Sequence, residues 1–263
     1  MREKKNIVIV GASSGIGREI ALIYAERGYR LGVCARRVEK LRELEEKYPG
    51  KVKAYQLDVD ADDAAVTFES ILHASGDVDI ILNCAGIGKY NPELDTDTDL
   101  NTIKTDCVGF TAIADTAFNY FSLPPVHSHK EGEECFGNRH PGGQFAAISS
   151  IAGVRTLGMS LSYSAAKRFQ TAYLEGLEQL RRIRKLPIVI TDIRPGFAAT
   201  ALLDKTRKYP MLMSPEYVAR LAVRAIDKKR RVAVIDWRYN LLVAVWRLIP
   251  RWLWVRLPIK LSI

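Results

Sequence analysis

Short apolar runs alternate along the chain with longer segments of mixed polarity. The predicted strands lie at 6–10, 31–35, 52–57, 78–82, 144–149, 188–193 and 231–235, and the first of them is a continuous apolar run rich in β-branched residues. Runs that are apolar throughout are typical of strands buried on both faces of a parallel sheet. The segments between them place apolar residues at helical spacing. This alternation predicts an α/β fold with one doubly wound, seven-stranded parallel sheet and helices on both of its faces.

The first predicted strand leads directly into a glycine-rich turn. Residues 11–17 read Gly-Ala-Ser-Ser-Gly-Ile-Gly, and a helical pattern follows to Gly28. Backbone N–H groups and the positive end of a helix attract a phosphate at such a turn, and glycine lets the ligand approach the chain closely. The turn therefore predicts a dinucleotide site formed by Gly11, Ser13, Ser14, Gly15, Ile16 and Gly17.

Two arginines follow the second predicted strand. Dinucleotide folds that select NAD carry an acidic residue near this point, which binds the ribose 2′-hydroxyl. This chain has Arg36 and Arg37 there. Because a guanidinium group can bind a 2′-phosphate through two hydrogen bonds, the pair predicts NADP(H) as the cofactor. The alternative is a surface pair of arginines that opens the helix at 38–48.

A serine, a tyrosine and a lysine have the spacing of an acid–base site. Tyr163 and Lys167 are four residues apart, so in the helix predicted at 161–184 they share a face. The lysine charge favours the phenolate form of the tyrosine, as a general acid–base tyrosine requires. Ser150 follows the strand predicted at 144–149, where its hydroxyl could bond the oxygen that Tyr163 protonates.

Together these motifs resemble the short-chain dehydrogenase/reductase family over about residues 6–235. The resemblance implies a Rossmann fold and reversible hydride transfer between NADP(H) and a carbonyl or an alcohol. Tyr163 would protonate the developing alkoxide, Ser150 would orient it, and Lys167 would also hold the ribose hydroxyls. The alternative is a non-catalytic NADP(H)-binding sensor or scaffold, which would bind NADPH tightly but turn over no carbonyl compound.

The same resemblance implies further cofactor contacts at the ends of other strands. The family aspartate that touches the adenine corresponds to Asp58, which is followed by Val59. A turn that passes the ribose corresponds to Asn83-Cys84-Ala85-Gly86, with Cys84 in place of a second Asn. A turn near the nicotinamide corresponds to Pro195, Gly196 and the later Thr200, and residues 201–213 would form the variable substrate lid.

One position departs from the family pattern. The long helix predicted from about 98 to 121 carries an Asn-x-x-Gly pattern in the family, and its Asn helps to hold a water that links the catalytic lysine to solvent. Here Gly109 is present, but Asp106 replaces the Asn. Because an ionised carboxylate accepts hydrogen bonds and cannot donate them, we predict an altered proton relay at Asp106. This departure is the only feature of the catalytic site that favours the scaffold.

The composition of the chain indicates a cellular location and argues against one class of partner, nucleic acid. Hydrophobic residues make up 48% and charged residues 26% of the 263-residue chain, as in an ordinary soluble globule. The four cysteines show no spacing typical of disulfide pairs, and no secretory leader is recognised. Both observations predict a location in the reducing cytoplasm. The net charge of +9 comes without a nucleic-acid-binding motif. A polar segment at 122–143 holds His127, His129, Cys135 and His140, but their spacing matches no familiar ligand set, so a mobile loop and no metal are predicted.

The C-terminal segment 237–263 has an unusual composition and is predicted to extend a domain formed by residues 1–236. It contains all four tryptophans and five basic residues, interrupted by Pro250 and Pro258. No 18-residue run lacks charge, so no membrane span is predicted. Trp and Arg at helical spacing suit a peripheral membrane contact. The alternatives, which we favour, are a partner subunit in a homo-oligomer or a roof over the pocket of a lipophilic substrate.

Overall fold

The computed structural model describes residues 5–122, 142–203 and 206–259. The predicted loop at 122–143, with its three histidines and Cys135, therefore lies almost wholly outside the described residues.

Seven parallel strands form one sheet in the order β3-β2-β1-β4-β5-β6-β7. The strands are β1 (Asn6–Val10), β2 (Arg30–Ala35), β3 (Val52–Gln56), β4 (Ile80–Asn83), β5 (Gly143–Ile148), β6 (Ile188–Arg194) and β7 (Val232–Val234). The chain builds outward from β1 to β3 and then crosses back to β4, so the direction of winding reverses between β1 and β4. Ligands bind outside the carboxyl ends of the strands at such a reversal. The predicted doubly wound sheet is confirmed.

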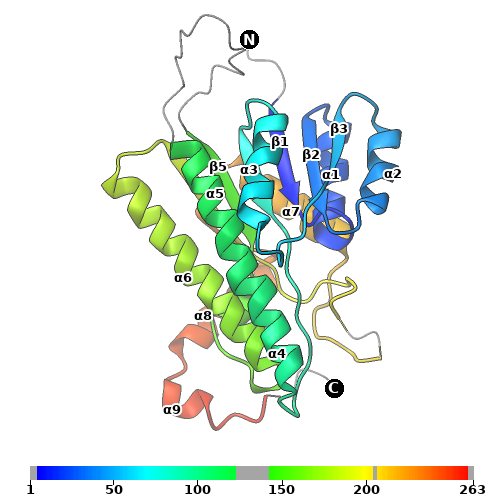
Figure 1. Cartoon of the computed structure of the whole chain (residues 1–263). Coiled ribbons are helices and arrows are strands. Elements are labelled where there is room, and N and C mark those ends of the chain that lie inside the picture. Colours follow the sequence, from blue (N-terminus) through cyan, green and yellow to red (C-terminus); the bar gives the residue numbers. More distant parts are fainter. Residues whose placement is uncertain (1–4, 123–141, 204–205, 260–263) are drawn as a thin grey trace, which may run out of the picture.

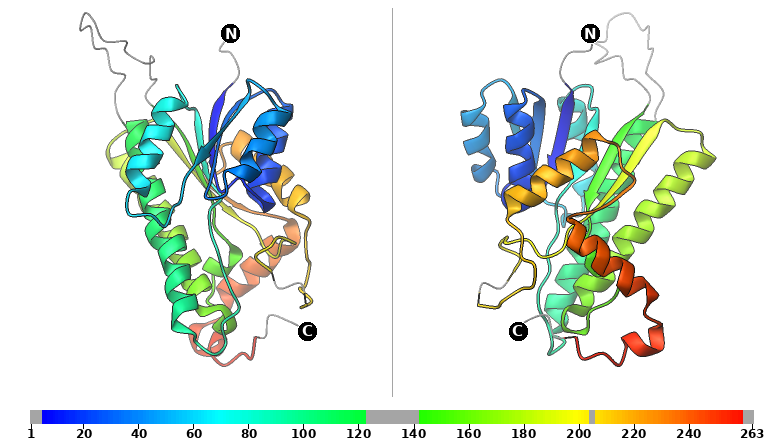
Figure 2. Two further views of the ribbon diagram at one scale, coloured as in Figure 1. Left: turned by 45° about the vertical axis from the view of Figure 1, so that its right-hand side comes forward. Right: turned by 180° about the vertical axis from the view of Figure 1, so that it is seen from behind.

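Helices cover both faces of the sheet, as Figures 1 and 2 show. The first face carries α1 (Gly15–Glu26), α2 (Glu39–Lys47) and α7 (Pro215–Asp227), and the second carries α3 (Ala64–Ala74), α5 (Phe110–Ser122) and α6 (Leu161–Ile183). Successive residues of β1 serve different faces: Ile7 and Ile9 pack with the first set, and Val8 and Val10 pack with the second. This two-sided burial explains why the strands read as continuous apolar runs.

The long helix before β5 begins earlier than predicted and is not α-helical throughout. It consists of α4 (Thr96–Ile103), a π-helical turn (Lys104–Gly109) and α5. The helix predicted from about 98 to 121 is therefore present, with a π-helical middle turn that the sequence did not predict. Two long-range contacts accompany the wider turn. A Cβ on Gly109 would lie 2.6 Å from the carbonyl oxygen of Val59, and Gln170 donates to the carbonyl oxygen of Asp106 at 2.8 Å.

The C-terminal segment folds into two helices that pack on the sheet domain, α8 (Trp237–Leu248) and α9 (Arg251–Trp254). Tyr239 and Val243 of α8 are buried in the same apolar cluster as α1 and α7. Both helices lie toward the carboxyl end of the sheet (Figure 1). No helix in the described part of the chain is both long enough and apolar enough to cross a membrane.

Candidate active site

A cavity of about 960 Å³ lies at the carboxyl end of the sheet and collects most of the predicted site residues. The predicted residues that line it are Gly11, Ser13, Ser14, Gly15, Ile16, Gly17, Arg36, Arg37, Val59, Ala85, Gly86, Ser150, Tyr163, Lys167, Pro195, Gly196 and Thr200. The lining does not include Asp58, Asn83 or Asp106. A cavity of this size lies in the range of small-molecule and cofactor sites.

The glycine-rich turn is a backbone cradle with no room for side chains. Gly11 has a φ of +83°, and a Cβ there would lie 2.6 Å from the amide nitrogen of Ala85. A Cβ on Gly17 would lie 2.4 Å from the carbonyl oxygen of Gly11. Ser14 is the N-cap of α1, but its side chain makes no capping hydrogen bond. The N-terminus of α1 thus faces the cavity through backbone donors, an arrangement that fits the pyrophosphate of a dinucleotide.

Arg36 follows β2 and lies beside two carboxylates, the predicted site residue Asp58 and Asp60, which the sequence did not identify as part of the site. Its guanidinium lies 3.6 Å from Asp60 and 4.0 Å from Asp58, and its side chain is 59% exposed. Asp60 also accepts a hydrogen bond from Thr105 at 2.9 Å, and both residues line the cavity. These contacts hold an exposed guanidinium at the edge of the cavity, where an anionic ligand can reach it.

Asn83 and Asp58 shape turns next to the cavity. The side chain of Asn83 is buried and accepts a hydrogen bond from the backbone of Ala85 at 3.0 Å, which fixes the turn after β4. Asp58 accepts one from the backbone of Asp60 at 3.1 Å. Asn83 therefore acts on the cavity through the backbone that it positions.

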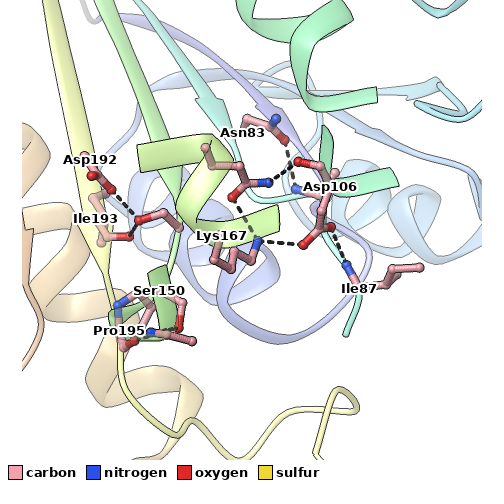
Figure 3. Close-up of polar contacts among 12 residues, drawn as sticks. Asn83, Ile87, Asp106, Ser150, Lys167, Asp192, Ile193 and Pro195 are labelled. Atoms are coloured by element: carbon pink, nitrogen blue, oxygen red, sulfur yellow. Dashed lines mark hydrogen bonds and ion pairs between the residues drawn. The ribbon is translucent and has the colours of Figure 1, made fainter. Parts of the chain in front are cut away.

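Ser150 is held at the end of β5 by short-range and long-range bonds. It caps a short 3₁₀ turn (Ile151–Gly153), where its Oγ accepts from the backbone of Ala152 at 3.1 Å and lies 3.5 Å from the carbonyl oxygen of Pro195. The preceding Ser149 donates to the carboxylate of Asp192 on β6 (Figure 3). The ends of β5 and β6 are thereby tied together, which fixes the place of the Ser150 hydroxyl.

Tyr163 projects from the first turns of α6 into the cavity and is packed on its ring face. A Cβ on Gly88 would lie 2.3 Å from a ring carbon of Tyr163, so the chain after β4 passes directly against the ring. The ammonium nitrogen of Lys167 lies 5.5 Å from the ring centre. The predicted pairing of these two residues on one helix face is what the structure shows.

Lys167 is buried in an ion pair with Asp106, which projects from the π-helical turn. The Lys167 nitrogen lies 3.0 Å from a carboxylate oxygen of Asp106 and donates to Gln170 at 3.0 Å (Figure 3). The other carboxylate oxygen accepts from the backbone of Ile87 at 2.8 Å. Asp106 is fully buried and Lys167 is 4% exposed. The residue at the departure from the family pattern thus contacts the predicted catalytic lysine directly.

The electrostatics of this pair keep the lysine protonated. Burial alone lowers the pKa of Lys167, but the carboxylate of Asp106 and the nearby Tyr163 outweigh it, so the pKa lies above its ordinary value. Burial raises the pKa of Asp106, and both Lys167 and the N–H of Ile87 oppose that rise. The cation beside Tyr163 is therefore accompanied by a neighbouring anion.

The C-terminal helices form one wall of the cavity. Tyr239, Leu242, Trp246 and Ile259 belong to the lining. The Tyr239 hydroxyl accepts from the backbone of Phe197 at 3.1 Å and donates to the carbonyl oxygen of Pro210 at 3.0 Å, so α8 joins the Pro–Gly turn to the lid segment. The inward-facing side of this segment therefore lies over the cavity, as expected of a roof.

A clamp around Arg155 fixes the outer end of this wall. Arg155 donates to the carbonyl oxygen of Trp246 at 3.1 Å, and its guanidinium lies 5.6 Å from the ring centre of Trp254. The indole N–H of Trp254 donates to the carbonyl oxygen of Thr156 at 3.0 Å. Two of the four tryptophans are therefore structural residues that hold α9 against the loop after Ser150.

Among the described residues, no group of three or more His, Cys, Asp or Glu side chains could hold a metal ion. The histidines at 127, 129 and 140 and Cys135 lie outside the described part of the chain.

Comparisons with known proteins agree with this geometry. A family model described as short chain dehydrogenase matches residues 5–210. Dehydrogenase/reductase SDR family member 7B of Xenopus tropicalis is 29% identical over 253 residues, covering 87% of this chain and 76% of the relative. An uncharacterized oxidoreductase of Mycobacterium tuberculosis (strain ATCC 25618 / H37Rv) is 27% identical over 269 residues, covering 98% of this chain and 96% of the relative. A solved short-chain dehydrogenase from Burkholderia cenocepacia J2315, in complex with NADP, has the same fold, with a TM-score of 0.77 at 16% identity over 98% of this chain and 99% of that one.

Proposed function

Because the chain belongs to the short-chain dehydrogenase family, we propose that it is an NADP(H)-dependent oxidoreductase that interconverts a carbonyl compound and an alcohol. The observation that carries the proposal is the meeting of Ser150, Tyr163 and Lys167 in one cavity with the glycine cradle. These residues come from separate elements, which the fold brings to the same end of the sheet.

The cradle and the cavity fit a dinucleotide. The α1 N-terminus and the glycines at 11, 15 and 17 would hold the pyrophosphate, and Arg36 and Arg37 would bind the 2′-phosphate. The other parts of the dinucleotide would be in contact with Val59, Ala85, Gly86 and Thr200. In this binding mode Arg36 exchanges its contacts with Asp58 and Asp60 for the phosphate. The bound nicotinamide would supply or accept the hydride.

The residues of this chain move and place the proton. Tyr163 gives its hydroxyl proton to the oxygen that becomes the alcohol and takes it back in the reverse direction. Ser150 donates a hydrogen bond to the same oxygen. Lys167, held by Gln170, places a positive charge beside the ring of Tyr163.

Asp106 is a positioning residue for Lys167. Its carboxylate fixes the lysine nitrogen at 3.0 Å and favours the charged form of the lysine. It also reduces the net charge that Tyr163 experiences, because an anion then stands beside the cation. We infer that Asp106 keeps Lys167 charged and in place beside Tyr163.

The substrate side of the cavity favours a lipophilic carbonyl compound. Its lining includes Phe197, Tyr209, Met211, Leu242 and Trp246, which present mainly apolar surface. Binding of an apolar substrate there would remove this surface from water.

A homo-oligomer is supported by a separate apolar surface on α4, the π-helical turn and α6. Leu100, Val108 and Phe169 are exposed there, and Phe169 stacks with Phe110 and Tyr173. We expect this surface to be buried between subunits, and sizing of the protein by light scattering would test the expectation.

Turnover with a panel of carbonyl compounds tests the proposed function. Purified full-length protein should consume NADPH with ketones or aldehydes of increasing apolar size, and faster with NADPH than with NADH. Binding of NADPH measured by its fluorescence separates the sensor or scaffold from the enzyme. Tight binding without turnover across the panel would overturn the proposal in favour of the scaffold.

A further inference from the structure

The helices α8 and α9 present a second, outward-facing apolar surface that the cavity does not use. Large side chains there are exposed to an unusual degree: Leu248 by 82%, Trp237 by 73%, Val255 by 69% and Trp252 by 62%. The outer tail surface, as we call it, consists of Trp237, Leu241, Val245, Leu248, Trp252, Leu253, Val255 and Leu257. Contiguous exposed apolar residues of this size mark an interaction site.

Arginines are interleaved with this apolar surface. Arg247, Arg251 and Arg256 are exposed, and Arg256 lies 5.6 Å from the ring centre of Trp252. Residues 237–263 contain no Asp or Glu. Within the described part of the chain, no carboxylate forms an ion pair with any of these three arginines. The outer tail surface therefore combines exposed tryptophan with uncompensated positive charge.

The combination of exposed tryptophan and positive charge distinguishes between two binding partners, a second copy of the chain and a lipid surface. A second copy of the chain, related by a two-fold axis, would bring the arginines of both copies into one interface to which neither segment contributes an acidic residue. An anionic lipid surface offers a negative charge for each arginine, an interface at which tryptophan rings are stabilised, and an apolar layer for leucine and valine. Charge complementarity therefore favours the lipid surface.

We propose that the outer tail surface binds the headgroup region of an anionic membrane, with α8 and α9 lying in the plane of the interface. The inner face of the same segment lines the cavity through Leu242, Trp246 and Ile259. A helix with its side chains is about 10 Å thick, so the cavity wall lies close to the lipid in this arrangement. Figure 2 shows α8 and α9 (orange-red to red) beyond the carboxyl end of the sheet, near the end of α6 that extends past the sheet.

The acidic first turn of α4 limits the docking surface. Asp97 and Asp99 lie in that turn, and α4 begins near the same end of the molecule as α9 (Figure 1). Anionic lipid would repel these carboxylates. The contact is therefore confined to the two C-terminal helices and does not extend to α4.

Flotation of the full-length protein with vesicles tests the proposal. The protein should float with vesicles of phosphatidylcholine and phosphatidylserine at low salt, less at high salt, and least with phosphatidylcholine alone. Joint replacement Arg247→Glu and Arg251→Glu should lower the bound fraction about tenfold or more. Joint replacement Leu248→Gln and Trp252→Gln should lower it at both salt concentrations, because the apolar contribution is not screened.

Matched variants separate lipid binding from general effects of charge and polarity. Arg30→Glu with Arg42→Glu makes the same charge change at exposed arginines outside the tail, and Val66→Gln with Ile183→Gln makes the same polarity change at residues 67% and 71% exposed. Both control proteins should float like wild type. All four variants should keep wild-type NADPH binding, which shows that they are folded.

Two results would overturn the proposal. Wild-type protein that stays unbound with anionic vesicles at low salt rules out the membrane surface. Tail variants that change the oligomeric state in solution and float like wild type would assign the surface to a second copy. Because flotation requires no turnover, failure of this proposal leaves the proposed oxidoreductase function untouched, and the converse also holds.

Discussion

The cofactor side and the substrate side of the cavity are built by different means. On the cofactor side, the glycine-rich turn and the turn after β4 contact each other through backbone atoms, since a Cβ on Gly11 would lie 2.6 Å from the backbone of Ala85. On the substrate side, contacts depend on side chains from distant parts of the sequence. The Tyr239 hydroxyl binds Phe197, and the Trp254 indole binds Thr156, 98 residues earlier.

This difference predicts different tolerance to change. A backbone cradle accepts only glycine at its closest approaches, because any side chain there displaces main-chain atoms. A wall of side chains can be repacked, so that its shape and its preferred substrate can change while the cradle stays intact. Tyr163 lies between the two sides, with Gly88 packed against the face of its ring, and it lines the cavity.

The largest expected effect comes from the residue between the two sides. Tyr163→Phe keeps the ring that packs on Gly88 but removes the oxygen that passes the proton, so kcat should fall at least ~100-fold. NADPH affinity should stay as in wild type. Tyr173→Phe on the same helix serves as control, because its hydroxyl bonds Asp115 and does not line the cavity. Steady-state kinetics would contradict the assignment if Tyr163→Phe kept wild-type turnover.

A change restricted to the cofactor side should act on binding alone. Arg36→Ala removes charge-assisted hydrogen bonds to the 2′-phosphate and should weaken NADPH binding by about 1.5–3 kcal/mol, with NADH binding unchanged. Arg42→Ala is a matched control on α2, outside the cavity lining. Titration of both cofactors decides the matter. Equal affinities of wild type for NADPH and NADH would show that the arginine pair has no part in selection.

A change restricted to the substrate side should spare the cofactor. Tyr239→Phe leaves the backbone N–H of Phe197 and the carbonyl oxygen of Pro210 without their partner, which should cost about 1–3 kcal/mol of unfolding free energy. We expect a higher KM for the carbonyl substrate and unchanged NADPH affinity. Tyr48→Phe, which loses one long contact to Glu26, is the control. A loss of NADPH affinity in Tyr239→Phe would mean that the two sides are not separate.

The smallest expected effect is a shift of the pH profile. Asp106→Asn removes the anion that lies 3.0 Å from the Lys167 nitrogen. The carboxylate of Asp106 raises the pKa of Lys167, so the lysine of the variant should lose its proton at lower pH than that of the wild type, and activity should decline earlier on the alkaline side.

The control for this prediction is Asp97→Asn on α4, an exposed carboxylate outside the cavity lining. It should keep the wild-type profile. An unchanged profile in Asp106→Asn, with the fold intact, would show that Asp106 stabilises the structure without tuning Lys167.

The cofactor side could be predicted from sequence because its requirements are local. The glycines at 11, 15 and 17 and the strand before them lie within one short stretch, and the predicted family and enzyme class are confirmed. Ser150, Tyr163 and Lys167 were likewise found from spacing, since helix geometry alone places Tyr163 and Lys167 on one face. The assigned roles of these residues, the cytoplasmic location and the domain boundary at 236 stay predictions.

The rest depends on contacts between distant segments. The sequence identified Asp106 as a departure from the family pattern. Only the packing of the π-helical turn against α6 brings Asp106 to Lys167, which also donates a hydrogen bond to Gln170. The sequence left three roles open for the tail, a lipid contact, a partner subunit and a roof, and favoured the last two. Its inward residues, such as Tyr239, are distinguished from outward ones such as Trp237 only once α8 is placed.

Transfer of labelled hydride tests the central claim most directly. Wild-type protein is supplied with NADPH that carries deuterium at the transferable position, together with a ketone that it reduces. The account predicts an alcohol with one deuterium on the former carbonyl carbon, seen by mass spectrometry, and almost none from Tyr163→Phe in the same time. Alcohol formed without deuterium, or formed equally well by Tyr163→Phe, would contradict it.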